Sequence, residues 1–273
     1  RSYLEELLSE LMPRLSNADE PDAAFAGFAY LVDGLSSGAQ FFALLFLNPP
    51  LCDLLCSIMI KAPRLAGTLG RAPILLDRVL DPDFFMPPKL PDQLHNNLKE
   101  RLVGLDSEQV LEHLSVWVEE QRFSCEVQAL EGRIDYNQFG FHYSNLSDIV
   151  IQEICYLAAK DFGKRYGYIK GSSYGIIGLG QLGSGMMTVH SDLDLVFVYD
   201  GDQDSLSDGV RKIGIATYYI KLSQLIASWL SVATSRGRLF EIDLRLRPDG
   251  KAGPIAVHTA RLSTYYQNEA WPW

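Results

Sequence analysis

The stretch GLGQLGSGMMTVHSDLDLVFVYD, residues 178–200, decides the fold of this chain. From Asp192 onward it is rich in β-branched and aromatic residues, which is typical of a strand. Successive side chains of a strand point to opposite faces, so Asp192 and Asp194 share one face while Leu193 and Leu195 turn to the other, into a core. Two carboxylates this close repel each other unless a cation lies between them. Oxygen ligands of this kind suit Mg²⁺ or Mn²⁺.

A third carboxylate lies further along the chain, in RLFEIDLRLRP, residues 238–248. Its alternation also predicts a strand, on which Asp243, Arg245 and Arg247 would share one face. Arginine forks match the geometry of phosphate groups, and an aspartate can complete the shell of a metal ion. We therefore expect Asp243 to join the two upstream aspartates as a catalytic and metal-binding residue, with both arginines against a nucleotide polyphosphate.

The glycine-rich segment before the first of these strands is the third part of the pattern. Gly178, Gly180, Gly183 and Ser184 are candidate phosphate-binding residues, because glycines let backbone N–H groups approach a phosphate and the serine adds a hydroxyl. The segment is not a Walker A loop, since no Gly-Lys-Ser/Thr follows, and a Rossmann unit would need a helix where a strand follows here. Each part alone is weak evidence, but the joint spacing is specific.

This joint pattern resembles the polymerase β-like nucleotidyltransferase superfamily, which combines a glycine turn, an Asp-apolar-Asp strand and a third acid on another strand. The matching residues here are Leu182-Gly183-Ser184, Asp192-Leu193-Asp194 and Asp243. The segment LFEIDLRLRPDGKAGPIAVHTARLSTYYQNEAWPW is similar to the glutamine synthetase adenylyltransferase family. That similarity is strong over residues 174–273 and looser back to about residue 70.

The resemblance implies an enzyme that transfers AMP from ATP to a tyrosine of glutamine synthetase, with Mg²⁺ or Mn²⁺ held by the three aspartates. The family has two related halves, of which the other removes AMP by phosphorolysis, and this chain is more similar to the C-terminal, adenylylating half. PII signalling protein and glutamine are implied as regulators of the full-length enzyme. Gln181 stands where the family usually has Lys, and Ser184 where it commonly has Gly. The first difference puts a phosphate contact from the loop in doubt.

Three alternatives stay open from the sequence. The chain could be the deadenylylating half, which uses the same acids with phosphate as the nucleophile. It could be a catalytically silent module that senses nucleotide or binds a partner, and Gln181 keeps this alternative open. A transferase acting on a small molecule fits the bare Asp-x-Asp pattern, but the match over residues 241–273 argues against it.

The sequence predicts two domains. Short segments that are apolar on one side, punctuated by Pro, Gly or Asn, predict a mostly helical module over residues 1–92. The proline-rich stretch 81–92 is the predicted linker. Residues 93–273 are predicted to form an α+β nucleotidyltransferase domain with a small mixed sheet. We expect its helices over 93–170 and its catalytic α/β core over 171–273.

Other residues carry weaker expectations. A loop from Asp135 is expected to pass into a helix capped by Asn145 or Ser147. His190, beside Asp192, is expected to be a hydrogen-bonding neighbour rather than a catalytic residue. Lys251 and Arg261 are expected on solvated faces, with contact to a phosphate or a partner protein as the alternative. The aromatic residues near the end are expected to pack against a following domain: Tyr265, Tyr266, Trp271 and Trp273.

Composition limits the partners. The chain has 273 residues and a formal net charge of -10, which repels phosphate backbones and predicts no functional nucleic-acid binding. No apolar run approaches the ~20 residues that span a bilayer, so no membrane partner is expected. Its four cysteines match no metal or redox spacing and indicate a reducing, cytoplasmic setting.

Overall fold

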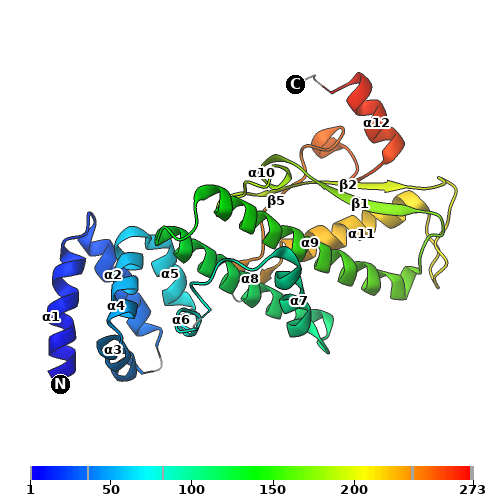
Figure 1. The fold of residues 1–273 in the computed structure, drawn as a ribbon. Coiled ribbons are helices and arrows are strands. Elements are labelled where there is room, and N and C mark those ends of the chain that lie inside the picture. Colours follow the sequence, from blue (N-terminus) through cyan, green and yellow to red (C-terminus); the bar gives the residue numbers. More distant parts are fainter. Residues whose placement is uncertain (1, 36, 82, 235–236, 271–273) are drawn as a thin grey trace. The chain divides into compact units, whose positions relative to one another are not determined.

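The computed structural model describes residues 2–35, 37–81, 83–234 and 237–270, and most of them are helical (Figure 1). Contacts divide the chain into two compact units. Unit 1 comprises Arg1–Pro88 and Glu119–Phe139, and unit 2 comprises Lys89–Val118 and Gly140–Trp273. The division thus falls inside two long helices as well as near the proline-rich stretch. The domain boundary at residues 92 and 93 stays a prediction.

Helices come first along the chain, and strands appear only after residue 172. The helices before the first strand are α1 (Ser2–Ser16), α2 (Pro21–Asp33), α3 (Gly38–Leu47), α4 (Pro49–Lys61), α5 (Pro63–Arg71), α6 (Leu75–Val79), α7 (Pro91–Leu102), α8 (Ser107–Leu130) and α9 (Tyr136–Tyr166). The remaining elements are β1 (Ser173–Gly178), α10 (Gly180–Gly183), β2 (Leu193–Asp200), α11 (Ile215–Leu230), β3 (Ala233–Thr234), β4 (Gly237–Arg238), β5 (Ile242–Asp243), the 3-10 turn η1 (Gly250–Ala252), β6 (Ala256–His258) and α12 (Thr259–Asn268).

Unit 1 is a stack of short helices around an apolar core. Prolines stand in the first turn of α2, α4 and α5, where a missing N–H costs no helical hydrogen bond. The side chain of Asn48 caps α4 by accepting from the amide of Leu51 at 3.3 Å. Leu31, Ile58 and Leu69 are completely buried in the core. Burial of one face of each short helix therefore holds this unit together.

The proline-rich stretch contributes to that core. Phe84 is buried and packs edge-on against Phe85, with ring centroids 4.9 Å apart, and near Phe123 of α8. The side-chain amide of Gln128 donates to the carbonyls of Phe84, at 2.7 Å, and Met86, at 3.3 Å. At least the first part of the expected linker is thus fixed by packing within unit 1.

Helix α9 begins earlier than the sequence analysis expected. Asp135 accepts from the amide of Gln138 at 2.8 Å, while the Gln138 side chain accepts from the amide of Asp135 at 2.9 Å. This reciprocal pair starts the helix at Tyr136. The expectation of a cap at Asn145 or Ser147 is wrong, because the Ser147 hydroxyl donates to a carbonyl one turn back, inside the helix.

The sheet of unit 2 is small and mixed, and β2 lies at its centre (Figure 1). Strand β1 pairs antiparallel along one edge of β2, while β5 and β6 pair parallel to β2 at its start and near its end. Leu193, Leu195 and Phe197 of β2 are fully buried, as the alternation predicted. Helix α11 covers the sheet through Tyr219, whose ring stacks on Tyr174 of β1 at 5.3 Å between centroids. The predicted α+β class with a small mixed sheet is confirmed.

No single helix of the described residues is both long and apolar enough to cross a bilayer. Helices α2 and α3 pass that test only when they are counted together as a bent pair.

Candidate active site

Strand register brings the predicted carboxylates together. Strand β5 pairs parallel with the start of β2, so that Leu193 is opposite Ile242 and Asp194 is opposite Asp243. Neighbouring strands lie about 4.8 Å apart, and Asp192 is two residues before Asp194. Asp194 and Asp243 are therefore neighbours on two paired strands, and Asp192 lies in the loop directly before β2, at the same end of the sheet.

Negatively charged carboxylates lie close together at this end of the sheet. Burial raises the pKa of Asp194, and the negative charges of Asp243 and Asp192 raise it further. Its side chain is half-buried, while Asp192 is exposed. The charge of Arg245 offsets part of this rise. A carboxylate whose pKa is raised by burial and by neighbouring charges is typical of sites that bind a cation or move a proton.

The expectation that Asp243, Arg245 and Arg247 share a strand face is wrong. Strand β5 ends at Asp243, and the chain then turns at Arg245 and Leu246. Arg245 folds back onto Asp243, with its backbone N–H and its Nε each 2.7 Å from a carboxylate oxygen. These hydrogen bonds lower the pKa of Asp243, and the charge of Lys251 lowers it further. The alternating pattern failed because a local acceptor satisfies Arg245 better than an extended backbone would.

Arg247, unlike Arg245, binds backbone carbonyls and no carboxylate of the site. Its guanidinium donates to the carbonyls of Gly253, at 3.1 Å through Nη2, and of Pro254, at 3.0 Å, and also to Leu244. These bonds close the loop that follows Asp243 into a compact turn. As it stands, Arg247 braces that loop rather than pointing its donors at a phosphate.

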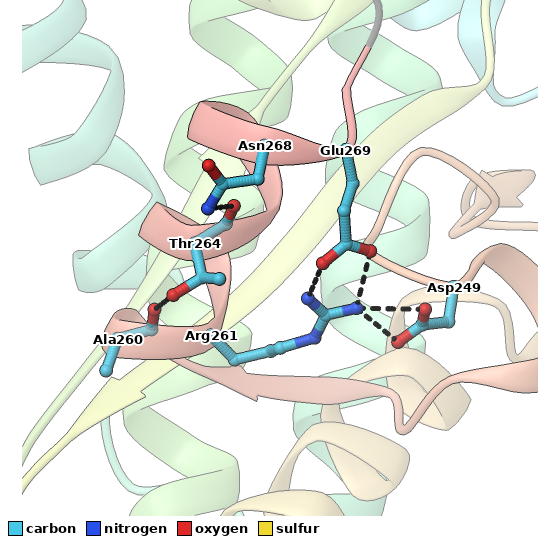
Figure 2. Close-up of polar contacts among 6 residues, drawn as sticks. All are labelled: Asp249, Ala260, Arg261, Thr264, Asn268 and Glu269. Atoms are coloured by element: carbon cyan, nitrogen blue, oxygen red, sulfur yellow. Dashed lines mark hydrogen bonds and ion pairs between the residues drawn. The ribbon is translucent and has the colours of Figure 1, made fainter.

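A second clamp fixes the same loop, and Figure 2 shows it. Arg261 of α12 pairs with Asp249 at 3.0 Å and with Glu269. Asp249 adopts a left-handed backbone with φ of 62°, which aspartate tolerates better than most residues. Arg261, expected on a solvated face, thus ties the turn after the arginines to the last helix.

The loop and the strand ends enclose an open cleft of about 370 Å³. It is lined by Asp192 and Asp243, by Arg245 and Arg247, and by Lys251. Lys251 is exposed, as expected, and it also lines the cleft, which the sequence analysis held only as an alternative because nothing in its local pattern separates it from a surface lysine. The only sequence signal was its position in the loop that follows the arginine pair.

Glycine at position 180 permits close approach to the carboxylates. Gly180 has φ of +54°, and a Cβ there would collide with the carboxylate of Asp194. At Gly183, a Cβ would lie 2.6 Å from the carbonyl oxygen of Gly178. The one-turn helix α10 therefore fits against the start of β2 only because these positions carry no side chain.

The expected phosphate donors of this segment are already used within it. The amide of Gly183 donates to Leu179 at 2.9 Å and that of Ser184 to Gly180 at 3.1 Å. The Ser184 hydroxyl donates to the carbonyl of Gln181 at 3.2 Å. Phosphate contacts of Gly178, Gly180, Gly183 and Ser184 stay predictions.

Gln181 connects the glycine segment to the first aspartate. Its side-chain oxygen accepts from the hydroxyl of Ser191, which precedes Asp192. The Ser191 oxygen in turn accepts from the amide of Thr188 at 2.8 Å. The residue that departs from the family pattern therefore has a structural task here, which is to hold the turn before β2. His190 lies on this turn with an exposed side chain.

The donor set suits a divalent cation, although its present arrangement does not form a finished cage. Among the residues the structure describes, no three carboxylate, imidazole or thiol groups converge closely enough to hold a metal ion. Both carboxylate oxygens of Asp243 accept hydrogen bonds from Arg245. Carboxylate oxygens are the ligands that Mg²⁺ prefers, and the metal-binding role of the three aspartates stays a prediction. The aromatic residues Trp271 and Trp273 lie outside the described residues.

Comparison with known proteins shows the family of this chain. Residues 52–273 match the family model described as glutamate-ammonia ligase adenylyltransferase. The chain is 39% identical over 275 residues to a bifunctional glutamine synthetase adenylyltransferase/adenylyl-removing enzyme of Bartonella henselae, with 100% of this chain and 28% of that protein covered. Similarly named enzymes of Mesorhizobium japonicum and Brucella suis are 37% and 35% identical, again over 100% of this chain and 28% of their own lengths. The chain thus spans little more than a quarter of these relatives, and it belongs to the glutamate-ammonia ligase adenylyltransferase family.

Proposed function

We propose that this chain carries a catalytic centre that transfers AMP from ATP to a tyrosine of glutamine synthetase. The observation that carries the proposal is the meeting of Asp192, Asp194 and Asp243 at one end of the sheet, beside the glycine helix. The names of the similar enzymes supply the substrate protein. The sequence resemblance to the adenylylating half favours transfer to the tyrosine over removal from it.

In the proposed site Asp192, Asp194 and Asp243 hold Mg²⁺ or Mn²⁺. The bound cation would acidify the attacking hydroxyl and neutralise charge on the polyphosphate. Arg245 keeps Asp243 deprotonated until the cation arrives, because its guanidinium pairs with the carboxylate. Once released, Arg245 is free to pair with phosphate oxygens, together with Lys251 on the same cleft. Arg247 contributes by fixing the loop that carries Arg245 and Lys251.

The proposed transfer balances as follows. The tyrosine oxygen bonds to the α-phosphorus of ATP, and the bond from that phosphorus to the bridging oxygen of pyrophosphate breaks. The hydroxyl proton passes to a carboxylate at the site, for which Asp243 is the candidate. Pyrophosphate leaves with the electron pair of the broken bond.

An assay with ATP labelled at the α-phosphate, Mg²⁺ and glutamine synthetase tests the proposal. Label on the synthetase supports it, and the label should disappear when Mg²⁺ is removed by a chelator. Release of ADP from pre-modified synthetase in the presence of phosphate would favour the adenylyl-removing reaction instead. Failure of both reactions would favour a silent regulatory module.

The remaining partner assignments are proposals of the same kind. PII signalling protein and glutamine are proposed as regulators of the whole enzyme. The cytoplasm is the proposed compartment, which agrees with the free thiols of Cys52, Cys56, Cys125 and Cys155. No nucleic acid or membrane is proposed as a partner.

A further inference from the structure

Unit 2 has a second groove, formed by residues of α9 and α11. It lies between the last turn of α9 and the exposed side of α11 and has a volume of about 430 Å³. Arg165 and Lys221 are its cations, and Asp161 is its acid. Asp161 pairs with Lys164 at 3.0 Å, so neither groove cation depends on it. The groove therefore presents positive charge on a chain whose net charge is -10.

A neighbouring loop adds to this charge. The amide of Gly209 donates to the carbonyl of Tyr166 at 3.0 Å, and that of Arg211 to the carbonyl of Arg165 at 3.4 Å. These bonds place Arg211 and Lys212 beside the groove, and both side chains are exposed. In the described part of the chain, no carboxylate pairs with Arg211, Lys212 or Lys221. Asp208 on the same loop accepts from the backbone amide of Tyr168 at 2.6 Å and keeps its charge, so it sets one negative charge against the cations of the patch.

The floor between these cations is apolar and rigid. Phe162 is buried and packs edge-on against Tyr218 of α11, with ring centroids 5.0 Å apart. Its ring also lies 4.4 Å from that of Tyr166. Leu225 of α11 lines the same groove and is half-buried. A firm apolar floor with arginine and lysine around it has the anatomy of a protein-docking site.

We propose that this groove docks an acidic segment of a partner protein, with carboxylates on Arg165, Arg211, Lys212 and Lys221 and one apolar side chain on the floor. A short acidic segment fits the size of the patch. A nucleic acid continues its charge beyond the patch, onto a surface that is acidic overall, and would be repelled there. The groove shares no lining residue with the cleft that holds Asp192 and Asp243. A bound segment would therefore leave the aspartates accessible.

Fluorescence anisotropy tests this with a short labelled peptide that is rich in glutamate around one central leucine. The competitor probes are the same peptide with glutamine in place of every glutamate, and labelled oligothymidine. The variant is Arg211→Glu/Lys212→Glu/Lys221→Glu. The control is Lys61→Glu/Lys89→Glu/Lys99→Glu, which changes the net charge equally at exposed lysines elsewhere. Circular dichroism of both variants establishes that they are folded.

The acidic peptide should bind the unaltered chain and the control alike, and the groove variant should bind it on the order of tenfold or more weakly. The affinity should also fall with added salt. Absence of peptide binding, equal losses in both variants, or equal binding of the glutamine peptide would overturn the proposal. Tighter binding of oligothymidine than of the acidic peptide would assign the groove to nucleic acid instead. None of these outcomes depends on the transfer of AMP.

Discussion

The two ends of strand β2 carry aspartates that differ in their electrostatic surroundings. At its end, Asp200 accepts from the hydroxyl of Thr259 at 3.0 Å and lies 3.5 Å from the ring nitrogen of His258. At its start, the pKa of Asp194 is raised by burial and by the charges of two other carboxylates. The same strand thus carries Asp200, which has partners within the fold, and Asp194, which lies beside other negative charges.

This difference separates structural from functional acids without reference to any homologue. A protein gains nothing in stability from crowding carboxylates that it does not pair, so such a cluster indicates a task outside the folded chain itself. A polar group that the local fold satisfies needs no further explanation. The comparison therefore supports the proposed chemical role of Asp194, whereas Asp200 helps to attach α12 through Thr259.

The largest expected effect comes from removing one acid at each end. Asp194→Asn should lower AMP transfer by roughly 1,000-fold or more, about 4 kcal/mol in the barrier, because a metal ligand and its charge are lost. Asp200→Asn should leave transfer unchanged and cost at most about 1 kcal/mol of stability, as expected for an exposed pair. Transfer rates and urea unfolding of both variants give the comparison. Near-normal transfer by Asp194→Asn would refute the assignment.

Buried His142 of α9 shows that conflict between burial and charge also occurs away from the site. Burial lowers its pKa from 6.5 to about 4. Between these values the unfolded chain binds a proton that the folded chain does not. Stability should therefore be complete above pH 6.5 and fall by about 3 kcal/mol as the pH drops to about 4.

Urea unfolding across this pH window tests the assignment. His142→Gln should lose that part of the pH dependence, while His113→Gln, at an exposed position, should keep it. An unchanged pH dependence in His142→Gln would show that other groups control acid stability.

Two glycines with the same backbone strain sharpen the comparison further. Gly180 and Gly185 have φ of +54° and +70°, but only a Cβ at Gly180 would strike the Asp194 carboxylate. Alanine at either position should cost about 1 kcal/mol of stability. Only Gly180→Ala should also reduce transfer, on the order of 100-fold, because the carboxylate must move. Equal transfer rates in the two variants would mean that the position of Asp194 is not critical.

Much of the fold could be predicted because its signals are local and periodic. The buried alternation of β2 and the apolar stripe of α11 depend on one face each, and the structure has both elements. The start of α9 was missed because the reciprocal bonds of Asp135 and Gln138 extend the helix before its apolar face begins. The sequence pattern therefore predicts the buried face of an element better than it predicts the residue at which a helix begins.

In the candidate site, too, one part could be predicted from the sequence and another part could not. The meeting of Asp194 with Asp243 follows from the alternation of two strands, and the parallel register places them side by side. The arginines do not follow, because Arg245 finds its acceptor two residues back and Arg247 finds carbonyls in a turn. For Lys251 a site role was only the alternative, because the closed loop and not the local pattern brings it to the cleft. Interactions that form across a turn produce no periodic pattern in the sequence, so the sequence does not predict them.

The smallest expected effects separate these two arginines. Arg247→Gln removes bonds to the carbonyls of Gly253 and Pro254 and should lower the free energy of unfolding by about 1–2 kcal/mol. Arg245→Gln removes an exposed partner of Asp243 and should leave unfolding in metal-free buffer unchanged. Because Arg245 competes with a cation for that carboxylate, its removal should let Mg²⁺ raise the melting temperature at lower concentrations. Thermal melts over a Mg²⁺ series measure both effects, with Arg238→Gln, at an exposed arginine that pairs with Glu241 outside the cleft, as the control. The opposite pattern, with Arg245→Gln less stable and no change in its response to Mg²⁺, would make Arg245 a structural brace and leave Asp243 without a role in cation binding.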